Sequence, residues 1–291
     1  MLAYPTPVDP LRPVRALFRF LAVLGIAARR WLAPRTAVLA AALSFHALLA
    51  LAPSLLVLLA VAGRLLGQEE ARRRLAEAAV RFAGPRADAV VSALLDPLTT
   101  RGHTTGTVVG LTLMMLFGST FFVRFRMALD AVWEVRDKRL VRQILLRAIS
   151  YVETLLAVAV SVVVLALGTL GSIVGPVLSR LAIGGAAAWS AWTRLGALVV
   201  TALFLATAFR YIPHVRPRPR WGSTLTGAVP AALALHLANE FLGWVVARNA
   251  LVSLYGAAGT VIVVLLWVYY SAFIVLFGAE VSRAWQERAS T

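Results

Sequence analysis

Three polar residues stand close together in a stretch that is otherwise apolar: His236, Asn239 and Glu240. Their i, i+3, i+4 spacing places them on one face of a helix. An ionisable side chain costs roughly 2.5 to 3.5 kcal/mol at the centre of a bilayer, so within a membrane span it marks a candidate pathway. Glu240 could carry a proton or bind a cationic group, and His236 could titrate beside it. In the competing interpretation, the three side chains join helices through hydrogen bonds of about 1 kcal/mol or less.

The first long apolar stretch holds a second candidate, His46, seven residues before Pro53. Proline has no N–H, so it loosens the backbone hydrogen bonding of the turn before it. We expect His46 and Pro53 to line an internal cavity together with the three residues above. A histidine that is hydrogen-bonded and buried by packing is the simpler alternative.

Catalytic chemistry is not indicated by the remaining sequence. There are four histidines without the spacing of a zinc site, and there is no cysteine. His236 and Glu240 form an i, i+4 pair that is one ligand short of a plausible metal site. Neither a phosphate-binding glycine-rich loop nor a serine nucleophile motif is present. We therefore predict no enzyme active site, no bound metal and no cofactor.

The composition explains what kind of element must position these residues. Of 291 residues, 60% are apolar and 14% are charged, and the mean hydropathy is +0.81. Soluble domains carry about 25% charged residues. A bilayer core of about 30 Å is crossed by roughly 20 mostly apolar helical residues, and blocks of that length are present. The sequence predicts an all-α integral membrane bundle with spans near residues 36–63, 104–123, 154–178, 189–210, 223–247 and 254–280.

The segments outside these spans are predicted to be helical as well. Residues 1–35 form an amphipathic helix at the membrane interface, and 64–103 form a small extracytoplasmic helical cap with a short helix at 87–95. The cap is stabilised by i, i+4 ion pairs, and residues 283–291 are a cytoplasmic tail. The expected pairs are Glu69 with Arg73, Glu70 with Arg74 and Glu77 with Arg81.

The basic residues predict the orientation. The formal net charge is +16, with 29 Lys and Arg against 13 Asp and Glu. Most basic residues fall in 1–35, 124–147, 210–220 and 283–288, which places these segments and both termini in the cytoplasm by the positive-inside rule. We expect membrane lipids as partners, with the anionic headgroups of the inner leaflet balancing the charge. Nucleic acid is not expected, because the basic stretches lack interleaved aromatic residues.

Two smaller patterns concern packing. Glu280 and Arg283 have i, i+3 spacing at the predicted inner interface and are expected to form an ion pair. Gly171 and Gly175 have a spacing that suits close helix packing within one chain or between chains, so an oligomer is left open.

Motifs along nearly the whole chain are similar to those of a known family. They are 40–49 leading to Pro53, Phe122 to Trp133, Tyr211 to Arg216, Tyr255-Gly256, Leu266 to Tyr269, and Gly278 to Glu280. In this order and spacing the chain resembles the YihY/virulence factor BrkB family of bacterial inner-membrane proteins. The resemblance implies a structural role for motif residues, which here are Asp130, Trp133, Pro213, Tyr255, Gly256, Trp267, Tyr269, Gly278 and Glu280.

The sequence also departs from the family pattern. The family usually has Tyr at the position of His46 and Asn at the positions of Asp130 and His214. In the fifth span it often has an acid at the position of His236, with a base near Asn239 or Glu240.

The resemblance implies a six-helix membrane protein suspected of transporting or exporting envelope components. Our expectation is a transporter or flippase-like exporter of an amphiphile or small solute, of unknown identity, in the bacterial inner membrane. The alternative is a membrane scaffold for envelope machinery that transports nothing. An older family label, ribonuclease BN, is not supported, because the residues hold no cluster that could activate water at a phosphate.

Overall fold

The described regular structure of this chain is α-helical. The computed structural model describes residues 12–83, 103–135, 148–149, 151–152, 156, 185–247 and 250–289, and no strand occurs among them. The predicted all-α membrane bundle is confirmed. The helices are α1 (Arg12–Trp31), α2 (Pro34–Leu66), α3 (Gln68–Ala83), α5 (His103–Val132), α7 (Gly185–Tyr211), α8 (Trp221–Ala247) and α9 (Ala250–Ala289).

Four helical stretches in the described part are long and apolar enough to cross a membrane. They are Pro34–Leu51, Val108–Val132, Arg194–Tyr211 and Ile262–Arg288. The predicted fifth span, 223–247, coincides with α8. Apart from residue 156, the predicted span 154–178 lies outside the described residues, as do the short helix at 87–95 and the Gly171 and Gly175 pair.

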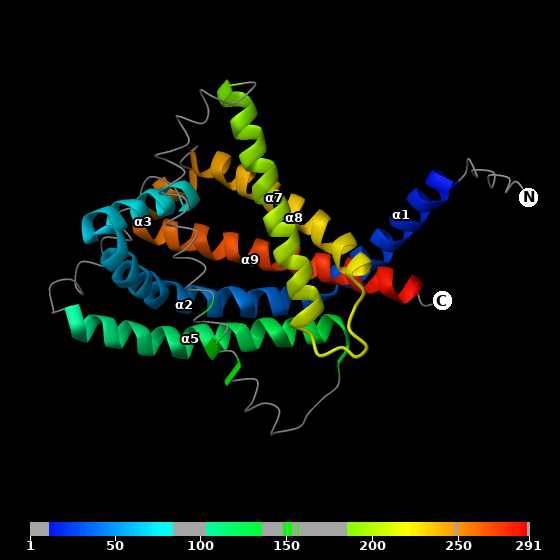
Figure 1. Cartoon of the computed structure of the whole chain (residues 1–291), viewed down its shortest axis with the longest axis horizontal. Coiled ribbons are helices and arrows are strands. Elements are labelled where there is room, and N and C mark those ends of the chain that lie inside the picture. Colours follow the sequence, from blue (N-terminus) through cyan, green and yellow to red (C-terminus); the bar gives the residue numbers. More distant parts are fainter. Residues whose placement is uncertain are drawn as a thin grey trace, which may run out of the picture.

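The long helices run side by side, with α9 in a central position (Figure 1). α9 packs against α8 on one side and α2 on the other, and α5 lies along α2. α7 crosses α8, and α3 caps one end of the bundle against α2, α8 and α9. At the opposite end α1 rests on the last turns of α9, where Val23 and Ala27 are buried with Val281 and Ala284.

Small side chains fill the core and large apolar ones face outward. Phe209, Leu129 and Leu276 are fully buried in a cluster that otherwise consists largely of alanine. Outward-facing Phe204 of α7 is 66% exposed and Phe241 of α8 is 65% exposed. Large exposed apolar groups suit contact with lipid tails, which do not penalise them as water does.

The ion pairs of α3 follow the sequence prediction in part. Arg74 Nε lies 2.6 Å from Glu70 Oε1, so that predicted pair is confirmed. Arg73 contacts Glu70 and Glu77 rather than Glu69. Hydrogen bonds from Arg73 and Arg74 lower the pKa of the Glu70 carboxyl. The side chain of Arg81 lies outside the described part.

α8 and α9 approach each other closely in the core at two glycines. A Cβ on Gly278 would lie 2.6 Å from the Ala231 Cβ and 2.9 Å from the Gly227 carbonyl oxygen. A Cβ on Gly227 would overlap the Gly278 carbonyl oxygen and the Ser282 hydroxyl. Gly278 and Gly227 therefore form a close packing contact between the two helices.

This contact predicts that Gly227→Ala destabilises the protein. The new methyl group would meet backbone atoms of α9 that cannot rotate away, and overpacking of this kind costs about 1 to 3 kcal/mol. The midpoint of thermal unfolding in mild detergent should fall. Gly222→Ala is the matched control, because a Cβ there meets nothing within 4 Å. An unchanged midpoint for Gly227→Ala would contradict the close approach of the two helices.

Candidate functional site at the arginine-rich end

One end of the bundle gathers the ends of five helices and many of the arginines. The start of α2, the end of α5, the connection from α7 to α8 and the end of α9 all lie there, beside α1. We call this the arginine-rich end, defined by Arg30, Arg35, Arg210, Arg220 and Arg283. Arginines flank the apolar spans because a guanidinium is stable at the interface and not in the hydrocarbon core.

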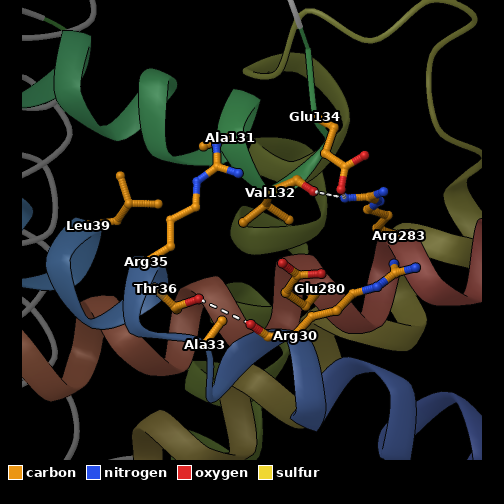
Figure 2. A pocket seen from close by; sticks show the side chains of 10 residues that line it. All are labelled: Arg30, Ala33, Arg35, Thr36, Leu39, Ala131, Val132, Glu134, Glu280 and Arg283. Carbon is orange, nitrogen blue, oxygen red and sulfur yellow. Dashed lines mark hydrogen bonds and ion pairs between the residues drawn. The ribbon is translucent and has the colours of Figure 1, made fainter.

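A cavity of about 180 Å³ lies between α1, α2, α5 and α9 at this end (Figure 2). It is far smaller than most sites for drug-sized ligands, which range from about 300 to 1,000 Å³. Its lining is mixed, with charged groups from three helices and small apolar side chains between them. The lining residues are Arg30, Ala33, Arg35, Thr36, Leu39, Ala131, Val132, Glu134, Glu280 and Arg283.

Glu280 is the most deeply buried charged group of this cavity. The residue is 6% exposed, and its Oε2 atom has no hydrogen-bond partner among the described groups. Figure 2 shows its side chain between Val132 of α5 and Arg30. A buried carboxylate oxygen without a donor costs free energy, so this atom is a candidate acceptor for a ligand.

Arg283, in contrast, directs two of its three guanidinium nitrogens, Nε and Nη1, to protein groups. Its guanidinium donates to the Val132 carbonyl oxygen at 2.5 Å and lies 3.1 Å from Glu134 and 2.6 Å from Glu287. The predicted ion pair between Glu280 and Arg283 is wrong. Arg283 instead pairs with Glu287, its i, i+4 neighbour, and reaches across to Glu134 and the Val132 carbonyl oxygen at the end of α5.

Of the two terminal nitrogens of the Arg30 guanidinium, one has a hydrogen-bond partner. Its Nη2 donates to Glu287 at 2.9 Å, while its buried Nη1 has no hydrogen-bond partner among the described groups. Thr36, which is 5% exposed, directs its hydroxyl to the Arg30 carbonyl oxygen, and Arg35 is exposed at the cavity rim. The cavity thus holds one unused acceptor and one unused donor, on opposite charges. A small polar ligand could satisfy both.

The residues predicted from the apolar spans lie elsewhere. His236 Nε2 is 3.4 Å from the Thr201 hydroxyl of α7, and Asn239 accepts a hydrogen bond of 2.7 Å from the Trp267 indole of α9. Glu240 is exposed on α8. The first two side chains therefore link helices, as the competing interpretation held.

His46 does not meet these α8 residues in any described contact. Its Nδ1 lies 2.8 Å from the Ala42 carbonyl oxygen of its own helix, and Pro53 is buried on α2. α9 lies between α2 and α8 (Figure 1), so His46 and the α8 residues sit on helices at opposite sides of it. That these four polar residues line one pathway stays a prediction.

The motif residues implied by the resemblance mostly take part in packing. Tyr269 stacks on Phe273 with ring centroids 5.9 Å apart, Trp133 packs against the core, and Pro213 is buried. Tyr255 and Gly256 fall within α9, but their surroundings lie outside the described part.

Asp130 joins two segments 84 residues apart. Its Oδ1 accepts a hydrogen bond of 2.7 Å from the backbone N–H of His214, and its Oδ2 lies 2.9 Å from the His214 Nδ1. The contact ties the end of α5 to the connection after α7. These are two of the positions at which the sequence departs from the family pattern, and they contact each other.

No metal site is formed in the part that the structure describes. Within it, no three His, Asp or Glu side chains come close enough to hold a metal ion. The cavity residues offer guanidinium, carboxylate and hydroxyl groups, which suit recognition of a charged ligand by hydrogen bonds.

A family model for virulence factor BrkB matches residues 27–291. The chain belongs to this family. Its relatives include a UPF0761 membrane protein of Methylibium petroleiphilum, 29% identical over 67% of this chain and 46% of that protein. Another, from Paraburkholderia xenovorans, is 36% identical over 32% of this chain and 21% of that protein.

The match with the first of these relatives covers less than half of that protein's length. No solved structure matches. As the match and the four long apolar helices agree, this BrkB family member is a membrane protein.

The contact between Asp130 and His214 predicts energetic coupling. Asp130→Asn and His214→Asn should each lower the midpoint of thermal unfolding, and the double variant should lose less than the two effects added. We expect a coupling energy of about 0.5 to 3 kcal/mol, as for other contacting polar pairs. Purified protein in mild detergent gives this from a double-mutant cycle. Additive effects would mean that the two side chains do not interact.

Proposed function

We propose that this protein is a multi-pass transporter of an amphiphile, and that the cavity at the arginine-rich end receives the polar headgroup. The observation that carries the proposal is the buried carboxylate of Glu280, whose Oε2 has no donor, in a small charged cavity. A protein that only needed stability would gain nothing from such a group.

The surroundings of the cavity suit the apolar part of such a ligand. Val38 and Phe45, spaced by seven residues on one face of α2, are 68% and 56% exposed. This stripe begins next to Arg35 at the cavity rim and runs along α2 away from it. Lipid tails could follow the stripe while the headgroup occupies the cavity.

The orientation is part of the proposal. We infer that the arginine-rich end faces the cytoplasm and that α3 lies on the extracytoplasmic side, because positive charge is retained in cytoplasmic loops. The transported headgroup would then be taken up from the inner leaflet. No bond is made or broken in this function, so the proposal requires no catalytic residue.

Single cysteines test the orientation, since the natural chain contains none. Glu69→Cys and Arg218→Cys introduce exposed thiols on α3 and on the connection after α7. A maleimide that cannot cross membranes should label Glu69→Cys in spheroplasts and label Arg218→Cys only after permeabilisation. The reverse pattern would place the cavity on the outer side and contradict uptake from the inner leaflet.

Reconstituted vesicles test transport. Acyl-labelled fluorescent phospholipids in the inner leaflet become accessible to external dithionite only if they move, and the protein should accelerate their loss, with or without an imposed pH gradient. Glu280→Gln should slow this movement about tenfold, because a charge-assisted hydrogen bond of about 1.5 to 3 kcal/mol is removed. Glu69→Gln, an exposed carboxylate on α3, is the matched control.

The outcome also separates the competing interpretations. If Glu240→Gln slows lipid movement and Glu280→Gln does not, the pathway follows α8 and the cavity is structural. If the wild-type protein never accelerates lipid movement but is isolated with a stable protein partner, the scaffold hypothesis replaces the transporter.

A further inference from the structure

The structure assigns a chemical class to the ligand of the cavity. We propose that the headgroup carries both a primary ammonium and a phosphate, as phosphatidylethanolamine does. The ammonium would pair with Glu280 and the phosphate with Arg30 and Arg35. The step from binding to transport rests on the proposed function, whereas the binding preference does not depend on it.

The requirement for an ammonium follows from Glu280. Its carboxylate belongs to a residue that is only 6% exposed, and Oε2 receives no hydrogen bond from a described group. A primary ammonium provides three N–H donors and a compensating charge in one group. A quaternary ammonium provides charge without a donor, so it would leave the oxygen without a hydrogen bond.

The requirement for a phosphate follows from Arg30. Its Nη1 is buried without a described partner, while its Nη2 is held by Glu287 at 2.9 Å. The Glu287 contact holds one terminal nitrogen of this cavity-lining residue, and the other is buried. Arg35 at the exposed rim adds a second guanidinium. Phosphate oxygens, like carboxylate oxygens, are acceptors that match the geometry and charge of a guanidinium group.

The combination of the two groups excludes simpler headgroups. Arg283 is held by Val132, Glu134 and Glu287, and it makes no hydrogen bond to the Glu280 Oε2. A purely anionic headgroup would leave the Glu280 oxygen unsatisfied and place a second negative charge beside it. A purely cationic one would leave Arg30 Nη1 unsatisfied and face Arg35. A ligand with both charges satisfies both atoms.

The size of the cavity agrees with a small headgroup. At about 180 Å³ it has the volume of roughly six water molecules in the liquid. A phosphate and a two-carbon amine fit such a space, whereas a headgroup of several sugar rings does not. The source could be a lipid or a free phosphoethanolamine compound, because both present the same chemistry to the cavity.

Native mass spectrometry of the full chain in mild detergent tests this assignment. The probes are dioleoyl phosphatidylethanolamine, its N-monomethyl and N-dimethyl forms, phosphatidylcholine and phosphatidylglycerol, all with the same acyl chains. We expect affinity to fall with each added methyl group and to reach about a tenfold loss at phosphatidylcholine, because donors to Glu280 disappear. Phosphatidylglycerol should bind at least as weakly as phosphatidylcholine.

Variants test the ammonium and phosphate contacts separately. Glu280→Gln should abolish the preference for phosphatidylethanolamine over phosphatidylcholine. Arg35→Gln should lower the affinity for phosphatidylethanolamine, phosphatidylcholine and phosphatidylglycerol alike, since all three contain the phosphate. Glu69→Gln is the control and should retain the wild-type preference. The methylation series uses the wild-type chain alone, so it decides the assignment even if Glu280→Gln does not fold.

A competition measurement shows whether the natural ligand is a lipid or a free compound. Competition by soluble glycerophosphoethanolamine at the lipid's own effective concentration would indicate a free compound, and no competition would indicate the lipid.

Equal affinity for phosphatidylethanolamine and phosphatidylcholine, or tighter binding of phosphatidylglycerol, would overturn the assignment. If labelled lipids move in vesicles without any headgroup preference, transport stands and this inference fails. If the protein binds phosphatidylethanolamine selectively but moves no lipid, this inference stands and the transport proposal fails.

Discussion

The fold depends on the close approach of α8 and α9 at Gly227 and Gly278. Because neither position carries a side chain, the backbones come close enough for the Ser282 hydroxyl to lie 3.4 Å from the Thr224 carbonyl oxygen of α8. α9 also contacts α1, α2, α5 and α7, so its position relative to α8 sets the position of the other helices. In a membrane, where apolar burial drives little association, such backbone proximity gives dispersion contacts that larger residues would prevent.

The arginine-rich end is organised by where α9 ends. Arg283 and Glu287 lie one turn apart on α9, and each reaches a different neighbour: Arg283 contacts the end of α5, and Glu287 contacts Arg30 of α1. This network uses up the charges on one side of the last turns of α9. Glu280, one turn earlier, faces the cavity between α2 and α5. The arginines of this network thus donate to other groups, and the Glu280 Oε2 has no donor among the described groups.

The helices were predictable from the sequence, because an apolar block of about 20 residues that crosses a bilayer must satisfy its backbone hydrogen bonds within the segment, as a helix does. The contacts between distant segments were not predictable. Asp130 and His214 are 84 residues apart, and each alone is an ordinary polar residue near the end of a span. The cavity draws on four helices, and its residues share no sequence spacing. The i, i+3 rule failed for Glu280 and Arg283, because the carboxylates of Glu287 and Glu134 hold the guanidinium. Glu134 follows another helix, and spacing within one helix carries no information about another.

The same reasoning explains why the polar residues of α8 were more conspicuous in the sequence than those of the cavity. His236, Asn239 and Glu240 interrupt a long apolar block, whereas Glu280 stands near charged residues at a helix end and resembles an ordinary interfacial acid. In the structure, Asn239 has a partner in Trp267 and Glu240 is exposed on α8, while Glu280 is buried and its Oε2 has no described hydrogen-bond partner. The cost of a polar group depends on its surroundings in three dimensions, and the buried Glu280 oxygen without a described donor is an indication of a ligand that spacing along the chain does not give.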